Sequence, residues 1–245
     1  MRLRIAHLYP DLLNLYGDRG NLLALRRRCH WRQIDSTVIP VSIGDPFLAD
    51  QYDIVFMGGG QDHEQNLLHK DLVETKGPLI CQAVEEGLVF LCICGGYQMM
   101  GQYYEEQDGH RISGIGALDI WTIARPDRMI GDMICQSHYL ADQGYDPVLV
   151  GFENHSGRTW LGPSVQSLGT VVRGRGNNGS DQTEGAIYRN VYCTYAHGSF
   201  LPKNPDMADY LIETALKRHY TEFSGLDKMN NQYENNARNY LLTCK

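Results

Sequence analysis

Apolar residues along the N-terminal half follow the pattern of an α/β protein. The unbroken apolar run Leu88–Ile93 is typical of a strand buried on both faces of a parallel sheet. Strands and helices alternate before it, which predicts a doubly wound fold with a mostly parallel central sheet flanked by helices. The earlier strands are expected at Leu3–Tyr9, at Ser36–Ile43 and from Tyr52 to Met57, and the helices at Leu22–Gln33 (capped by Asn21) and Leu67–Glu86 (interrupted at Gly77-Pro78).

The pattern changes after Glu106, where glycine-rich turns separate additional short strands. A helix over Asp206–Tyr220, begun by Pro205, follows these strands, and a polar tail follows the helix. We therefore expect one domain over residues 1–220 and a tail over residues 221–245. The short strands are expected at Leu118–Ala124, Met129–Ser137, Val148–Phe152, Ser167–Arg173, Gly185–Tyr188 and Val191–Tyr195.

Composition narrows the class of protein. The formal net charge of −7 argues against nucleic-acid binding. The seven cysteines are odd in number and scattered, and the first residues do not form a signal peptide, so we expect free thiols and a cytoplasmic location. No apolar run approaches the roughly 20 residues that span a bilayer. The basic cluster Arg26-Arg27-Arg28 is typical of a solvated helix face, with contact to an anionic partner as the alternative.

Cys94 follows the buried strand directly and precedes Gly95-Gly96 and a predicted helix over Tyr97–Tyr104. A reactive side chain between a strand and a helix, beside glycine, has the geometry of a nucleophile elbow. A free cysteine is otherwise most often a small buried hydrophobe, which is the interpretation for Cys92. No second cysteine pair with zinc-like spacing is present, so a metal site is not predicted.

A thiol nucleophile needs a base, and two of the nine histidines, His155 and His197, differ from the others in their context. His197 comes after Val191–Tyr195 and precedes a glycine, so a strand of the same parallel sheet would bring it to the edge where Cys94 lies. His155 is interpreted as a structural hydrogen bonder. The triple glycine Gly58–Gly60 is either a tight turn or a source of N–H groups for an oxyanion. No Walker loop follows it, so no ATP site is expected.

Several motifs together resemble the class I (triad-type) glutamine amidotransferases, in particular the cobyric-acid-synthase-like members and, among those, the GatD group of glutaminase subunits. The resemblance covers nearly the whole chain and implies a class I amidotransferase, flavodoxin-like fold. The motifs are Tyr16-Gly17-Asp18-Arg19-Gly20-Asn21, Gly58-Gly59-Gly60-Gln61-Asp62, Cys94-Gly95-Gly96-Tyr97-Gln98, Arg128-Met129-Ile130-Gly131-Asp132, Gly151-Phe152-Glu153-Asn154-His155-Ser156-Gly157-Arg158-Thr159 and Thr194-Tyr195-Ala196-His197-Gly198.

The resemblance implies a role for each matched residue. The thiolate of Cys94 attacks the side-chain amide of glutamine and forms a γ-glutamyl thioester, while His197 transfers the protons. The N–H groups of Gly60 and Gly95 hold the oxyanion. Gln98 lies where the family contacts glutamine, and Arg128 pairs with the substrate carboxylate. A solvated turn arginine is the alternative for Arg128, and Arg125 is its rival for the substrate-binding role.

One position departs from the family pattern. Many members carry a glutamate two residues after the histidine, whereas Ser199 stands there in this chain. The site therefore works as a Cys–His dyad, or another carboxylate such as Glu153 or Glu184 orients the imidazole.

The resemblance to the GatD group implies a glutaminase subunit in a heterodimer with a Mur-ligase-like partner of the MurT type. That partner would use ATP and magnesium, with no cofactor in this chain, to amidate D-glutamate of lipid II to D-isoglutamine in peptidoglycan synthesis. The chain would then reach the inner membrane face only through its complex. The alternatives are a stand-alone cysteine hydrolase (a γ-glutamyl hydrolase or PfpI-like peptidase), a glutaminase for another acceptor such as cobyric acid, and a non-catalytic scaffold in which Cys94 only packs.

Overall fold

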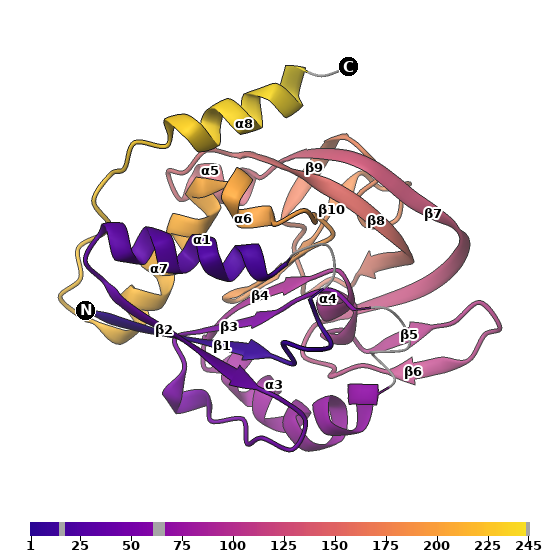
Figure 1. Ribbon diagram of the computed structural model, residues 1–245. Helices are drawn as coiled ribbons and strands as arrows, with labels where there is room; N and C mark the ends of the chain where they lie inside the picture. The colour runs from indigo at the N-terminus through magenta and orange to yellow at the C-terminus, as the bar shows by residue number, and fades with distance from the viewer. Residues whose placement is uncertain (15–17, 61–66, 244–245) are drawn as a thin grey trace.

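A six-stranded sheet, nearly all parallel, forms the centre of the molecule (Figure 1). The computed structural model describes residues 1–14, 18–60 and 67–243. Five neighbouring strands run parallel, and β11 pairs antiparallel with β12 at one edge. This confirms the predicted α/β fold with a parallel central sheet. In spatial order the strands are β11 (Ala186–Tyr188), β12 (Val191–Thr194), β4 (Val89–Ile93), β3 (Ile54–Met57), β1 (Arg2–Leu8) and β2 (Asp35–Val41).

Helices cover both faces of this sheet, which explains why β3 and β4 are apolar throughout. In Figure 1, α1 (Arg19–Trp31) and α7 (Pro205–His219) lie on one face. The π-helical segment η3 (Lys70–Lys76) and α3 (Gly77–Glu85) lie on the other face. A short 3-10 turn, η2 (Ala49–Gln51), precedes β3.

The second half of the chain forms a separate, mixed sheet beside the first (Figure 1). The sequence predicted two short strands around residue 127, but the structure has one long strand with a bulge between Ala124 and Met129. The strand predicted to end at Phe152 continues to Leu161, because it pairs with that long strand along most of its length. The sheet contains β5 (Tyr103–Glu105), β6 (Arg111–Ser113), β7 (Ile120–Gln136), β8 (Val148–Leu161), β9 (Gly169–Arg173) and β10 (Thr183–Glu184).

Three predicted helix features are wrong in detail. Helix α1 begins at Arg19, so Asn21 lies inside its first turn and accepts a hydrogen bond from the Leu201 N–H instead of capping the helix. Gly77-Pro78 does not split its helix, because the π turns before it lead directly into α3 with Pro78 in the first turn. The helix after Cys94, α4 (Gly95–Met99), is only five residues long and gives way to β5.

The C-terminal tail folds back onto the body instead of extending into solvent. Helix α8 (Gln232–Thr243) packs against the short α6 (Phe200–Lys203), and α5 (His138–Asp142) lies near it (Figure 1). Arg238 pairs with Asp146 at 2.5 Å, and Arg28 pairs with Glu234 at 3.6 Å. Over the described ranges, none of the helices combines the length and the apolar content needed to cross a bilayer.

Candidate active site

Cys94 occupies the turn between β4 and α4, at the carboxyl edge of the central sheet. Its backbone has φ 48° and ψ −103°, a conformation that non-glycine residues rarely adopt and that is common at functional turns. The following glycines let the chain pass close to β3, because a Cβ at Gly96 would lie 2.7 Å from the Met57 carbonyl oxygen. Cys94 is only 7% exposed. The sulfur is therefore held at one place on the sheet edge, as a nucleophile elbow requires.

His197 lies beside Cys94 because β12 and β4 are parallel neighbours in the sheet. Thr194 pairs with Ile93, so the chain leaves both strands at the same edge. Two hydrogen bonds with Phe152 then fix the backbone of His197. A Cβ at Gly59 would lie 2.9 Å from the His197 Cε1 and 3.6 Å from the Cys94 Cβ, so both side chains close around this glycine. The structure thus brings together the predicted nucleophile and base.

A carboxylate that the sequence did not assign completes the cluster. Asp18 Oδ1 lies 3.5 Å from the His197 Nδ1, and both side chains are fully buried. The other oxygen of Asp18 accepts the Gly59 N–H at 2.7 Å. Asp18 immediately precedes α1, and Gly20 in that helix packs on Ser199, whose Oγ lies where a Gly20 side chain would be. The residue before α1 thus places a carboxylate beside the imidazole, in a chain that has Ser199 where many family members carry a glutamate.

The predicted alternatives for this role, Glu153 and Glu184, are wrong because each is used elsewhere. Glu153 accepts the N–H groups of Arg175 and Gly176 at 2.7 and 2.9 Å. Glu184 accepts the Thr194 hydroxyl at 2.6 Å and the Tyr195 N–H at 2.9 Å. Glu153 thus holds the turn at Arg175, and Glu184 holds the end of β12. The signal for Asp18 was in the sequence, since it belongs to a matched motif between β1 and α1, but only the fold shows that it faces His197.

The charges around His197 favour its protonated form. Burial lowers the pKa of the imidazole, but the Cys94 thiolate and the Asp18 carboxylate together raise it to about 10. The other buried histidine, His155, favours its neutral form, because burial lowers its pKa to about 3. Its ring stacks on the ring of Tyr195, with the two centroids 3.6 Å apart, and its Nδ1 lies 2.7 Å from the Gly157 carbonyl oxygen. His197 is thus suited to hold a thiolate as an ion pair, and His155 to remain neutral within the protein.

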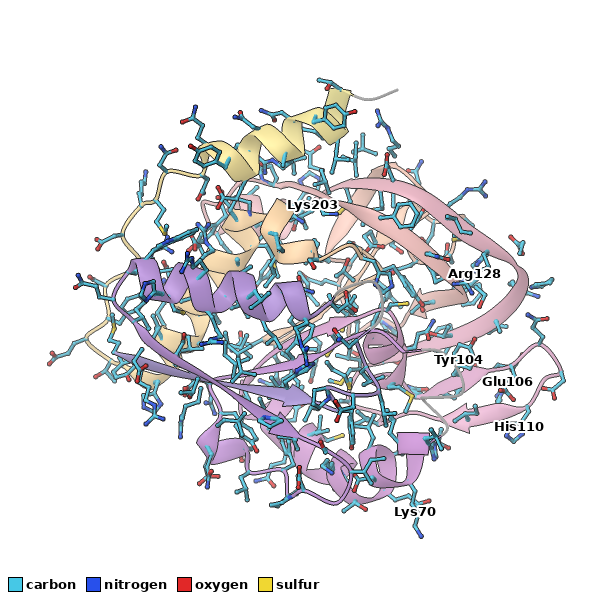
Figure 2. All side chains as sticks on the ribbon, in the orientation of Figure 1. Lys70, Tyr104, Glu106, His110, Arg128 and Lys203 are labelled. Atoms are coloured by element: carbon cyan, nitrogen blue, oxygen red, sulfur yellow. The ribbon has the colours of Figure 1, made fainter. Side chains whose placement is uncertain are left out.

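Arg128 lies on the bulge of β7, toward solvent (Figure 2). Its guanidinium donates to the Asn154 side-chain oxygen at 2.9 Å and to the Asn154 carbonyl oxygen at 3.0 Å. It is close enough to help lower the pKa of His155. Arg125 stands on the same bulged strand, three residues earlier.

The remaining predicted site residues surround the elbow. Gln98 is buried in α4, and its amide donates to the Tyr195 hydroxyl at 3.1 Å and fills the space above Gly157. Its side chain supports the wall of the site in this structure. Gly60 follows β3 and Gly95 begins α4, so both backbones lie at the sheet edge. The motif residues Tyr16, Gly17, Gln61 and Asp62 lie outside the described residues.

The pH dependence of stability tests the buried, structural character of Glu184. Burial raises the pKa of Glu184 to about 7 from its ordinary 4.5, so the folded protein holds a proton that the unfolded chain releases. This stabilisation is complete below pH 4.5 and is lost as the pH rises to 7, by about 3 kcal/mol in total. In Glu184→Gln we expect the free energy of unfolding, followed in urea, to fall less over this range than in the wild type. Parallel pH curves for the two proteins would contradict the assignment.

This α/β fold, with Cys94 and His197 together at the edge of its sheet, agrees with the class of glutamine amidotransferases that the motifs resemble. Residues 4–205 match the family described as the CobB/CobQ-like glutamine amidotransferase domain, and the chain belongs to this family. The resemblance predicted from the motifs is confirmed.

Two relatives narrow the comparison. The chain is 40% identical over 240 residues to the lipid II isoglutaminyl synthase (glutamine-hydrolyzing) subunit GatD of Staphylococcus aureus, covering 98% of this chain and 95% of that protein. It is 42% identical over 220 residues to the subunit of the same name from Streptococcus pneumoniae, covering 89% of this chain and 82% of that protein. A cobyric acid synthase of Pelotomaculum thermopropionicum is 30% identical, but only 37% of its length is matched.

Solved structures of low sequence identity share the fold. A structure of PurLQS from Thermotoga maritima matches with a TM-score of 0.62 at 17% identity, covering 89% of this chain and 99% of that one. A glutaminase domain of CTPS from Trypanosoma brucei matches with a TM-score of 0.57 at 11% identity, covering 92% of this chain and 98% of that one. In both comparisons the similarity extends over most of this chain.

Proposed function

We propose that this chain hydrolyses L-glutamine to glutamate and ammonia and delivers the ammonia to a Mur-ligase-like subunit, in a heterodimer. The observation that carries the proposal is the meeting of Cys94, His197 and Asp18 around Gly59 at the edge of the sheet. Membership of the amidotransferase family supports glutamine as the substrate.

The geometry suits a thioester mechanism. The Cys94 thiolate, paired with the His197 imidazolium, attacks the γ-carbonyl carbon of glutamine, and the carbonyl oxygen becomes an oxyanion. N–H groups of Gly60 and Gly95 would stabilise that oxyanion, and losing one such donor typically costs roughly 3 kcal/mol of barrier. His197 then gives its proton to the departing nitrogen, which leaves as ammonia. It next takes a proton from water, which attacks the thioester and releases glutamate and the thiolate. Asp18 keeps the imidazole oriented and stabilises its charge.

Arg128 is proposed to bind the α-carboxylate of glutamine. A guanidinium forms strong, bidentate hydrogen bonds with a carboxylate, and Asn154 holds this one in place from β8. In Arg128→Ala we expect the KM for glutamine to rise about 30- to 100-fold while kcat changes little, since the contact is made in the ground state and the transition state alike. Steady-state ammonia release measures this.

Arg125→Ala is the matched control for Arg128, because it removes the same charge from the same strand. We expect its KM to stay within a factor of two or so of wild type, as for an exposed charge outside the site. If Arg125→Ala raised KM and Arg128→Ala did not, the carboxylate site would belong to Arg125.

The acceptor is proposed to be the α-carboxyl of D-glutamate in the lipid II stem peptide. Two relatives that are 40% and 42% identical are named as subunits of lipid II isoglutaminyl synthase. The partner would activate the acceptor with ATP and magnesium. The experiment is to purify the chain with and without the Mur-ligase-like subunit and to measure ammonia release and amidated lipid II. Ammonia release that the subunit leaves unchanged, without amidation of lipid II, would favour a stand-alone cysteine hydrolase instead.

A further inference from the structure

An apolar groove on the outer surface between α1, α6 and α8 has no role in the chemistry described so far. It has a volume of about 330 Å³. The lining is mostly apolar, and two large side chains of α1 stand open to solvent on it: Leu23 is 59% and Trp31 50% exposed. Leu201 and Pro202, which follow His197 in the chain, and Glu234 of α8 also line the groove. A mostly apolar groove can receive an apolar anchor side chain of a partner.

We propose that this groove binds an apolar anchor flanked by acidic residues on the Mur-ligase-like subunit, and that binding there aligns Asp18 with His197. The inference rests on the proposed function, because that function supplies the partner.

The charge at the groove's edge selects the kind of partner. Arg26, Arg27 and His30 lie on the exposed face of α1, and the Arg27 guanidinium sits over the Trp31 ring at 5.7 Å. This basic rim consists of Arg27 in the groove and of Arg26 and His30 in an adjoining hollow, and it stands on a chain whose formal net charge is −7. A partner with acidic residues around its anchor therefore complements the rim. The sequence left contact with an anionic partner as the alternative for the cluster Arg26-Arg27-Arg28. Arg28 is instead buried and pairs with Asp209 at 2.5 Å, so only Arg26 and Arg27 of that cluster remain exposed for such a contact.

The shape favours a protein over an anionic lipid surface. A concave groove holds an inserted side chain, whereas a bilayer surface meets a flat or convex face with its apolar residues outermost. The overall negative charge of the chain also opposes approach to anionic lipid.

Helix α1 connects the groove to the catalytic residues. Asp18 comes immediately before this helix and faces His197, and Gly20 in its first turn contacts Ser199 two residues after His197. Asn21 accepts a hydrogen bond from the Leu201 N–H at 2.8 Å, which ties the helix to a residue that lines the groove. The Asp18–His197 separation of 3.5 Å exceeds that of a strong hydrogen bond. A small shift of α1 on binding would shorten it and speed catalysis.

The test compares Leu23→Glu, Trp31→Glu and the charge reversal Arg27→Glu with wild type. Leu79→Glu is the matched control, since Leu79 is 46% exposed on α3, across the sheet. Affinity for the purified Mur-ligase-like subunit is measured by calorimetry, and ammonia release is measured with and without that subunit. We expect the three groove variants to bind at least about 10-fold more weakly and to lose stimulation, with unchanged release when alone. Leu79→Glu should match wild type, and melting temperatures check folding.

Wild-type affinity and stimulation in the groove variants would overturn the proposal alone. A wild-type chain that does not bind the subunit would overturn both this proposal and the heterodimer of the proposed function. Binding of wild type to phosphatidylglycerol vesicles that Leu23→Glu abolishes, with subunit binding intact, would assign the groove to lipid instead. A different result would contradict the proposed glutaminase activity, namely that wild type releases no ammonia from glutamine either with or without the subunit. The affinity measurements would still decide where the subunit docks.

Discussion

Replacing Cys94 with alanine is expected to abolish ammonia release from glutamine, by at least about 10⁴-fold in kcat, because no other group can form the thioester. The elbow conformation at φ 48° is set by the flanking glycines and strand, so the fold should be retained. The electrophile 6-diazo-5-oxo-norleucine gives an independent readout: mass spectrometry should find it on Cys94 in wild type and find no adduct in Cys94→Ala.

Cys81→Ala is the matched control for Cys94. Cys81 is a half-buried free thiol on α3, on the face of the sheet opposite α1. Its loss should leave kcat within a factor of two or so. Ammonia release that persists in Cys94→Ala would show that the chemistry takes place elsewhere, and a wild-type chain that the electrophile does not label would favour the scaffold interpretation.

Replacing Asp18 with asparagine is expected to lower kcat by about 10²- to 10³-fold with little change in KM. In the Ser–His–Asp triad of serine proteases, the corresponding substitution lowers kcat about 10⁴-fold, because the histidine is held in the wrong tautomer. Here the carboxylate is 3.5 Å from the imidazole, which indicates a smaller effect. Asparagine has nearly the same size, and its oxygen can still accept the Gly59 N–H, so the loop should hold its shape.

The pH profile separates this orienting role from a purely structural one. The Asp18 carboxylate is one of the charges that raise the pKa of His197 to about 10. Removing it lowers that pKa, so the imidazolium is lost at lower pH and the alkaline limb of kcat/KM should move to lower pH in Asp18→Asn. Asp35→Asn, an exposed aspartate on β2, is the control and should keep the wild-type profile. An unshifted limb in Asp18→Asn, even with reduced activity, would contradict the role.

The local signals in the sequence were sufficient for the central sheet and for the nucleophile. Leu88–Ile93 is apolar throughout because β4 has helices on both faces, and the glycines after Cys94 are needed because the backbone passes 2.7 Å from where a Gly96 side chain would begin. The position of His197 beside Cys94 could be predicted because the carboxyl ends of parallel strands lie at the same edge of a sheet. These inferences depend on near neighbours in the chain or on one general property of sheets.

The second sheet and the Asp18 contact depend on pairings between distant segments. The bulge in β7 joins two strands that the sequence separated, because the long partner β8 supplies hydrogen bonds on both sides of it. Asp18 lies far from His197 in the sequence, and nothing in its neighbours reveals which side chain it meets. Glu153 and Glu184 were equally plausible partners until their hydrogen bonds to Gly176 and Tyr195 were known.

The sequence by itself determined the α/β class, the parallel sheet, the thiol at its edge and the histidine beside it, because periodicity, glycines and strand ends are encoded locally. Only the tertiary structure decided which carboxylate completes the site, how the tail folds back over α6, and that Leu23 and Trp31 line a groove next to the catalytic loop. The physical reason is that hydrogen bonds and packing between residues far apart in the chain are fixed only when the whole fold closes.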